Sequence, residues 1–349
     1  MPELPRQPAH EALEYTERAS PTVSDRLFTR PFVRKALIGT YALSVATAGV
    51  ITAENTYNFL REDKTTTIEE INSNAPEQYE DTSWVVIPGF NMAWRDSREA
   101  AEALEPAFEE TGRINWLGYS NKGFDIGDIK ETLLEYVREQ NIDQVRLYGY
   151  SFGGMVSLEL AGFLDEHGIR VPSIVLDSTP SSSKDVRLQG PFGAICSGAV
   201  GPLVHAAAEV LSAPKPLQRL GALSPSEKNA TNHVSADLLR TTCQYIDTFN
   251  LNEAIADLPK ETLVAYIGSD NDEQIRTDDS FETFDKKINK KRPLLKLDSS
   301  PSGHASPRGD TEIYLRMVRL VNLATTEPQD VERFLPEPSY RYSNNQTKE

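Results

Sequence analysis

Residues 144–161 (QVRLYGYSFGGMVSLELA) constrain the fold of this chain most, because they predict a strand, a sharp turn and a helix in succession. The first part is a short apolar run typical of a buried strand, and the last part suits a helix packed on a sheet. Between them, residues 149–153 form a G-x-S-x-G pentapeptide centred on Ser151. So sharp a turn needs small residues on both sides of its strained centre, and the two glycines supply them.

The position of Ser151 before the helix suggests chemistry. Unpaired N–H groups and the positive end of a helix dipole stabilise negative charge that develops on a substrate oxygen. The pentapeptide alone is also compatible with a glycine-rich βα turn of no chemical function. The strand before it and the helix after it favour the functional interpretation.

Length and charge limit the possible classes of protein. The 349 residues suffice for one large α/β domain with an insertion, or for two small domains. The net charge of −16 opposes binding of the domain surface to nucleic acid or to an anionic membrane, so we expect no nucleic-acid partner.

The two cysteines, Cys196 and Cys243, form no C-x-x-C or Cys/His cluster, so the sequence predicts no metal site. They are compatible with a disulfide or with two buried free thiols, and we favour the thiols.

The N-terminal region reads as a disordered basic leader over residues 1–35, followed by an uncharged stretch over residues 36–53. A helix of that length spans about 27 Å, close to one bilayer core. Cationic residues are denser before the stretch, which predicts a single-pass anchor with the following domain outside the cytoplasm. A cleaved signal peptide, with a secreted product, and a helix packed on a soluble domain are the alternatives. Residues 54–82 read as a linker.

From residue 83 onward, short apolar strands alternate with amphipathic helices, which predicts a mostly parallel sheet of about six strands flanked by helices. We assign this α/β core to residues 83–179 and 257–325. The long interval at residues 180–256 breaks the alternation and is predicted to be a helical cap. Residues 326–349 read as a polar tail.

Polar residues that follow the predicted strands carry the expected chemistry, because ligands of parallel sheets gather beyond the carboxyl ends of the strands. In chain order these residues are Ser151, an aspartate near 270–272, and His304. A serine hydroxyl needs a base to take its proton, an imidazole can do so near neutral pH, and a carboxylate fixes its tautomer.

With these residues the chain resembles the α/β-hydrolases over about residues 83–325, including their Ser…Asp…His order and the inserted cap. The resemblance implies that Ser151 is the nucleophile, His304 the general base and Asp272 the acid. Asp270 is an alternative acid, and so is Asp177, as in those relatives that place the acid one strand earlier.

The resemblance also implies an oxyanion hole made by the backbone N–H groups of Phe152 and Phe90. The second donor follows from residues 88–90 (PGF), which resemble the family's His-Gly-x loop although Pro88 replaces the histidine. A main-chain donor does not depend on that side chain. Phe90, Met92 and Trp94 are expected either to shape an acyl pocket or to pack in the core.

The resulting hypothesis is a serine hydrolase that cleaves a carboxylic ester, or else a thioester or amide, of a small molecule or lipid through an acyl-enzyme on Ser151, without cofactor or metal. Two alternatives stay open: acyl transfer with the same triad, and a membrane-tethered binding scaffold without turnover.

Overall fold

The computed structural model describes residues 65–187 except 91, 93 and 121, residues 236–328 except 289–291, 293 and 301, and residues 341–343. The expected leader (1–35) and anchor or signal segment (36–53) lie outside these ranges. In the part of the chain that is described, none of the helices has the length and apolar character needed to cross a bilayer.

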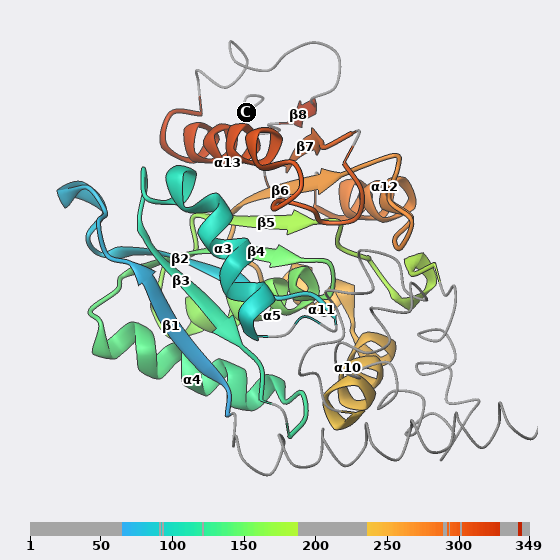
Figure 1. The fold of residues 1–349 in the computed structure, drawn as a ribbon, viewed down its shortest axis with the longest axis horizontal. Coiled ribbons are helices and arrows are strands. Elements are labelled where there is room, and N and C mark those ends of the chain that lie inside the picture. The colour runs from blue at the N-terminus through green and yellow to red at the C-terminus, as the bar shows by residue number, and fades with distance from the viewer. Residues whose placement is uncertain are drawn as a thin grey trace, which may run out of the picture. The chain divides into compact units, whose positions relative to one another are not determined.

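The core is an eight-stranded sheet in the order β1-β3-β2-β4-β5-β6-β7-β8 (Figure 1). Six neighbouring strands, from β3 to β7 in this order, are parallel, and the edge strands β1 and β8 are antiparallel to their neighbours. The mostly parallel sheet of about six parallel strands is therefore confirmed. The strands are β1 (Thr67–Asn72), β2 (Thr82–Ile87), β3 (Arg113–Gly118), β4 (Gln144–Tyr150), β5 (Ser173–Asp177), β6 (Leu263–Gly268), β7 (Leu294–Asp298) and β8 (Arg341–Ser343).

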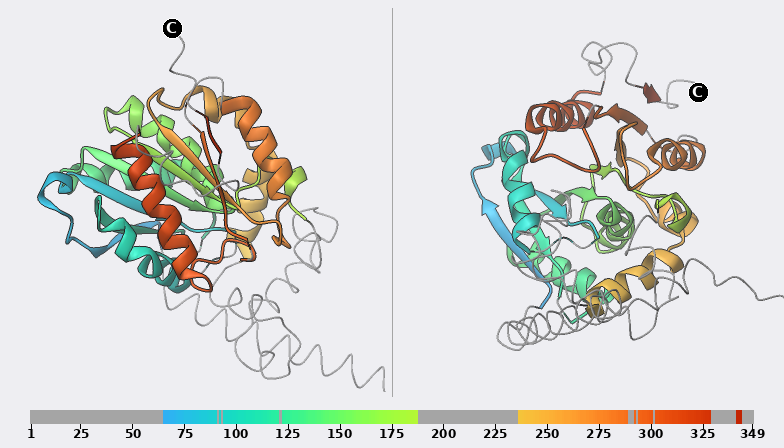
Figure 2. Two further views of the ribbon diagram at one scale, coloured as in Figure 1. Left: turned by 90° about the horizontal axis from the view of Figure 1, so that it is seen from above. Right: turned by 45° about the vertical axis from the view of Figure 1, so that its right-hand side comes forward.

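Helices cover both faces of the sheet (Figures 1 and 2). Helices α3 and α13 pack on one face, and α4, α5, α11 and α12 pack on the other. The helices are α3 (Trp94–Phe108), α4 (Ile126–Glu139), α5 (Phe152–Glu166), α10 (Ala236–Thr248), α11 (Leu251–Ala256), α12 (Thr277–Ile288) and α13 (Thr311–Thr326), with short 3-10 turns η1 (Glu77–Tyr79) and η2 (Ser183–Asp185).

Strand β2 shows why the sheet is buried on both sides. Val85 and Ile87 belong to the core beneath α4 and α5, whereas Trp84 and Val86 belong to the core beneath α3 and α13. All four side chains are fully buried. Successive residues of a strand point to opposite faces, so a continuous apolar run is what a central parallel strand requires.

Strand β1 corrects the prediction that residues 54–82 are a linker. Its sequence, TIEEIN, has only two apolar residues and was not recognised as a strand. An antiparallel edge strand is bonded on one side only and tolerates charged residues, so its apolar signal is weak. Strand β8 similarly lies within the predicted tail (326–349).

The predicted cap is described only at its two ends. Its C-terminal end forms the helices α10 and α11. Leu238 and Leu239 of α10 and Leu251, Ala254 and Ile255 of α11 all lie in the core that α5 also covers.

Cys243 on α10 is disulfide-bonded, so the preference for free thiols is wrong for this residue. The sequence contains one other cysteine, Cys196, which lies outside the described residues.

Candidate active site

Ser151 occupies the sharp turn between β4 and α5. Its backbone has φ 48° and ψ −116°, a conformation that a residue with a side chain rarely adopts. An added Cβ on Gly149 would lie 2.5 Å from backbone atoms of Gly153, and one on Gly153 would lie 2.3 Å from the carbonyl oxygen of Ile87. Only glycine fits at both flanking positions, as the pentapeptide predicts.

The loop after β2 packs directly against this turn. An added Cβ on Gly89 would lie 3.5 Å from the Cβ of Ser151, and the preceding carbonyl, of Pro88, accepts a hydrogen bond of 2.8 Å from the Tyr119 hydroxyl. Gly89 therefore lies close to Ser151, and Phe90 is the next residue in the chain. Phe152 is the first residue of α5, so its N–H has no acceptor within the helix.

The side chains near this loop divide between the two cores. Phe90 packs against the core beneath α4 and α5, and Met92 against the core beneath α3 and α13. The thioether sulfur of Met92 also accepts the N–H of Gly89 at 3.1 Å. These contacts give Phe90 and Met92 packing roles, and the side chain of Trp94 lies outside what the structure describes.

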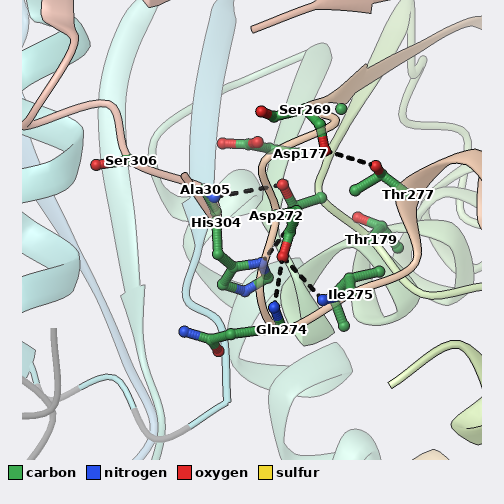
Figure 3. Close-up of polar contacts among 12 residues, drawn as sticks. Asp177, Thr179, Ser269, Asp272, Gln274, Ile275, Thr277, His304, Ala305 and Ser306 are labelled. Atoms are coloured by element: carbon green, nitrogen blue, oxygen red, sulfur yellow. Dashed lines mark hydrogen bonds and ion pairs between the residues drawn. The ribbon is translucent and has the colours of Figure 1, made fainter. Parts of the chain in front are cut away.

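His304 and Asp272 form a direct pair. The Nδ1 atom of His304 lies 2.8 Å from Oδ2 of Asp272, and Figure 3 shows the imidazole ring pointing at this carboxylate. Asp272 comes from the loop after β6 and His304 from the loop after β7, and these strands are neighbours. The Asp272 side chain is completely buried, whereas that of His304 is 14% exposed. The geometry is that of an imidazole oriented by a carboxylate and still partly exposed.

Two backbone N–H groups hold the second oxygen of Asp272. Gln274 and Ile275 each donate to Oδ1 at 2.8 Å (Figure 3). Burial by itself raises the pKa of Asp272, but the hydrogen bond and charge of His304 and these two donors outweigh it and lower the pKa below the ordinary value. Asp272 is therefore held as a carboxylate.

The alternative acids lie elsewhere. Asp270 is exposed and lines a polar cavity of about 830 Å³ bounded by η2 and α12. The Asp177 carboxyl is fully buried and accepts the hydroxyls of Tyr148, at 3.0 Å, and Tyr314, at 3.5 Å. In the structure the imidazole of His304 is paired with Asp272 and not with either alternative.

Burial raises the pKa of Asp177 to about 8. The hydrogen bond from Tyr148 lowers this pKa, and the charge of Asp272 raises it further. Two carboxyl groups at the ends of neighbouring strands thus have opposite pKa shifts. Asp272 is ionised, whereas Asp177 keeps its proton until near pH 8.

The segments that carry Ser151 and His304 meet at the end of β5. The carbonyl oxygen of Asp177 accepts the N–H of Ser151 at 2.6 Å, and the hydroxyl of Ser178 accepts the N–H of Ala305 at 3.3 Å. Ser178 and Tyr314 could not be predicted as part of this arrangement, because neither residue follows a recognisable spacing. Within the described residues there is no group of three or more His, Cys, Asp or Glu residues that could hold a metal ion.

No protein-family model matches the sequence, and a search of curated proteins finds no match. Solved structures do match over most of the chain. An enol-lactonase from Burkholderia xenovorans LB400 is 14% identical, with a TM-score of 0.52 over 74% of this chain and 95% of the enzyme. An esterase from Exiguobacterium antarcticum is 15% identical, with a TM-score of 0.51 over 75% of this chain and 96% of the esterase. An esterase from Rhodococcus sp. ECU1013 is 15% identical, with a TM-score of 0.51 over 75% of this chain and 94% of the esterase. The strand order, the turn at Ser151 and these similarities together show that the chain has the α/β-hydrolase fold.

Proposed function

We propose that this chain is a serine hydrolase that cleaves a carboxylic ester through an acyl-enzyme on Ser151. The observation that carries the proposal is the contact between Nδ1 of His304 and Asp272. When Nδ1–H donates to this carboxylate, the neutral imidazole has its lone pair on Nε2. Nε2 is then the atom that accepts the proton of the Ser151 hydroxyl.

In the proposed reaction, Oγ of Ser151 attacks the ester carbonyl while Nε2 of His304 takes the hydroxyl proton. The tetrahedral intermediate collapses, the bond to the alkoxy oxygen breaks, and the leaving alcohol receives that proton from His304. A water molecule then attacks the acyl-serine and gives a proton to Nε2. Collapse of the second intermediate releases the acid and returns this proton to Ser151.

The negative oxygen of both intermediates needs donors fixed in advance. We assign this role to the backbone N–H groups of Phe152 and Phe90. The closeness of Gly89 to Ser151, which an added Cβ on Gly89 would approach within 3.5 Å, supports the assignment of Phe90 because the loop after β2 then lies beside the nucleophile. Pro88 stands where the family has a histidine, but the proposed donor is a main-chain N–H group and does not depend on that side chain.

Ester cleavage is supported by the similar structures, which are described as esterases and as an enol-lactonase. We therefore expect a small-molecule or lipid ester as substrate. A series of p-nitrophenyl esters of graded acyl length is the direct test of acyl preference, and product analysis with an added alcohol separates hydrolysis from acyl transfer.

The decisive experiment is labelling with a fluorophosphonate probe, which phosphonylates an activated serine. The wild-type chain should be labelled, and Ser151→Ala should abolish both labelling and ester hydrolysis. Ser173→Ala is the matched control, because this buried serine lies at the opposite end of β5 from the site. A folded wild-type protein that neither labels nor hydrolyses any ester would instead be a binding scaffold.

We also propose that residues 36–53 anchor the chain in a membrane with the catalytic domain outside the cytoplasm. The disulfide at Cys243 supports this location, because disulfides persist in oxidising compartments. Protease added to intact cells should digest the catalytic domain. A domain that is protected until the cells are lysed would contradict the proposed orientation, and a product lacking residues 1–48, cut after the small residues Ala46 and Ala48, would indicate a cleaved signal.

A further inference from the structure

The end of β5 contacts both of the segments that the proposed mechanism needs. Strand β5 lies between β4, which leads to Ser151, and β6, which leads to Asp272. Its last residue, Asp177, holds the Ser151 N–H through its carbonyl oxygen at 2.6 Å. The next residue, Ser178, is fixed to β6 by its N–H, which donates to the carbonyl oxygen of Ile267 at 2.8 Å. This dipeptide is therefore tied to the central sheet.

The two residues that follow His304 are hydrogen-bonded to side chains around the same dipeptide. The Ala305 N–H donates to the Ser178 hydroxyl at 3.3 Å, and the Ser306 N–H donates to the Tyr314 hydroxyl at 3.1 Å. Figure 3 shows these two residues and His304 in one continuous segment beside Asp272. Both acceptor hydroxyls therefore act on the backbone that carries the imidazole.

One of these hydroxyls in turn bonds to a buried carboxyl group, and the other belongs to the next residue in the chain. The Tyr314 hydroxyl donates to Oδ1 of Asp177 at 3.5 Å, and Ser178 directly follows Asp177. Asp177 and Ser178 are fully buried. The Tyr314 hydroxyl can accept from the Ser306 N–H and donate to Asp177 at the same time. Both hydroxyls therefore link the His304 loop to the end of β5.

Backbone strain indicates that these contacts are needed. Ser178 has φ 49° and Ala305 has φ 35°, so both partners of one hydrogen bond are in the left-handed region without being glycine. Such conformations persist only where the surroundings hold them, and they cluster at functional sites. An unstrained loop would place the backbone after His304 differently.

We propose that Ser178 and Tyr314 are positioning residues that hold His304 against Asp272 and toward Ser151, with Asp177 as their common anchor. The inference rests on the proposed function, and it assigns to Asp177 a role other than that of the triad acid. Neither hydroxyl touches the reacting atoms. Each acts through the backbone of the His304 loop.

The test uses the full-length chain with Ser178→Ala and Tyr314→Phe, each of which removes one hydroxyl. We expect kcat for a p-nitrophenyl ester to fall on the order of 10- to 100-fold in each variant with KM nearly unchanged, because a small displacement of a base costs rate and not binding. The matched controls are Ser173→Ala, at the other end of β5, and Tyr136→Phe, whose hydroxyl bonds Asn115 away from the site. Both controls should keep the wild-type kcat.

Coupling to His304 separates positioning from a general loss of structure. In a His304→Ala background, Ser178→Ala and Tyr314→Phe should not lower the residual rate further, because the group they position is gone. The same factor of loss in both backgrounds would overturn the proposal. So would a wild-type kcat in both single variants.

A spectroscopic readout keeps this test separate from the proposed function. The proton between Nδ1 of His304 and Asp272 should give a strongly deshielded NMR resonance, which should shift or broaden in Ser178→Ala and Tyr314→Phe but not in the controls. If the wild type hydrolyses no ester, the proposed function fails and this resonance alone decides: an unchanged resonance in both variants overturns the positioning role. Thermal unfolding of each variant shows that the measurement is made on folded protein.

Discussion

The imidazole of His304 and the carboxylate of Asp272 meet with Nδ1 and Oδ2 2.8 Å apart, although 32 residues separate them in the chain. The contact follows from the sheet, because β6 and β7 are parallel neighbours whose carboxyl ends reach the same edge. The contact also shows which of two nearby aspartates pairs with the imidazole, which their spacing in the sequence does not show. Asp270 is exposed, and Asp272, two residues later, is buried under the imidazole.

The first prediction compares these two aspartates. Asp272→Asn should lower kcat by about four orders of magnitude, because an amide no longer favours the correct tautomer of His304 or the imidazolium that forms. Asp270→Asn is the matched control and should stay within a few-fold of wild type. Initial rates on one p-nitrophenyl ester measure both. A large loss in Asp270→Asn with little effect in Asp272→Asn would transfer the acid role to Asp270.

The second prediction concerns stability in acid. The pKa of Asp272 is lower in the folded chain than its ordinary value of about 3.9, so the folded state binds fewer protons than the unfolded state just below that pH. The contribution of Asp272 to stability is therefore fully present above about pH 4 and is lost as the pH falls through the folded-state pKa.

Urea unfolding of wild type and Asp272→Asn between pH 7 and pH 2 measures this contribution. The difference between their free energies of unfolding should be constant at the upper end of the range and should shrink at the lower end. A difference that does not change with pH would mean that Asp272 is not the ionised partner in the folded protein.

The third prediction concerns Asp177, whose contribution to the free energy of unfolding should change with pH in the opposite direction. Burial raises its pKa to about 8, so between about pH 4 and pH 8 the folded state binds a proton that the unfolded state does not. The free energy of unfolding should therefore fall as pH rises through this window, by up to about 1.4 kcal/mol per pH unit from this group. Asp177→Asn, which does not titrate, should lack this slope.

The same unfolding titration, carried out from pH 4 to pH 9, compares wild type with Asp177→Asn. Parallel stability curves for the two proteins would show that Asp177 has a similar pKa in the folded and unfolded chains. Tyr148 and Tyr314 donate to different oxygens of Asp177, so asparagine keeps an acceptor for one of the two hydroxyls, which makes it a milder change than alanine.

Much of the fold could be predicted from the sequence because the central strands are buried on both faces. Residues such as Val85 and Ile174 lie in continuous apolar runs, and such runs are distinctive. The edge strand β1 and helix α12 were missed for the opposite reason. In α12 the buried Phe281, Phe284 and Ile288 are spaced for one helical face, but charged residues dominate the segment and obscure that signal.

The candidate site was predictable only as far as local sequence specifies it. The turn at Ser151 has glycines at fixed spacing, and His304 follows a strand, so local sequence is enough to propose both residues. Choosing between Asp270 and Asp272 requires knowing which side chain turns inward, which depends on the loop after β6. The hydroxyls of Ser178 and Tyr314 contact the His304 loop from β5 and α13, and no local pattern in either element marks such long-range contacts.

The last prediction compares two glycines beside the proposed catalytic residues. An added Cβ at Gly153 would lie 2.3 Å from the carbonyl oxygen of Ile87 and 2.6 Å from that of Pro88, and these backbone atoms cannot move without displacing β2. Gly153→Ala should therefore destabilise the protein by about 3 kcal/mol or more. At Gly303, next to His304, an added Cβ meets nothing within 4 Å, so Gly303→Ala should change stability by less than about 0.5 kcal/mol.

Urea unfolding measures both variants, and the rate of fluorophosphonate labelling should stay near wild type for Gly303→Ala alone. A Gly153→Ala protein with wild-type stability and labelling would show that β2 does not press against the turn at Ser151, and would remove the structural basis for placing the Phe90 N–H beside the nucleophile.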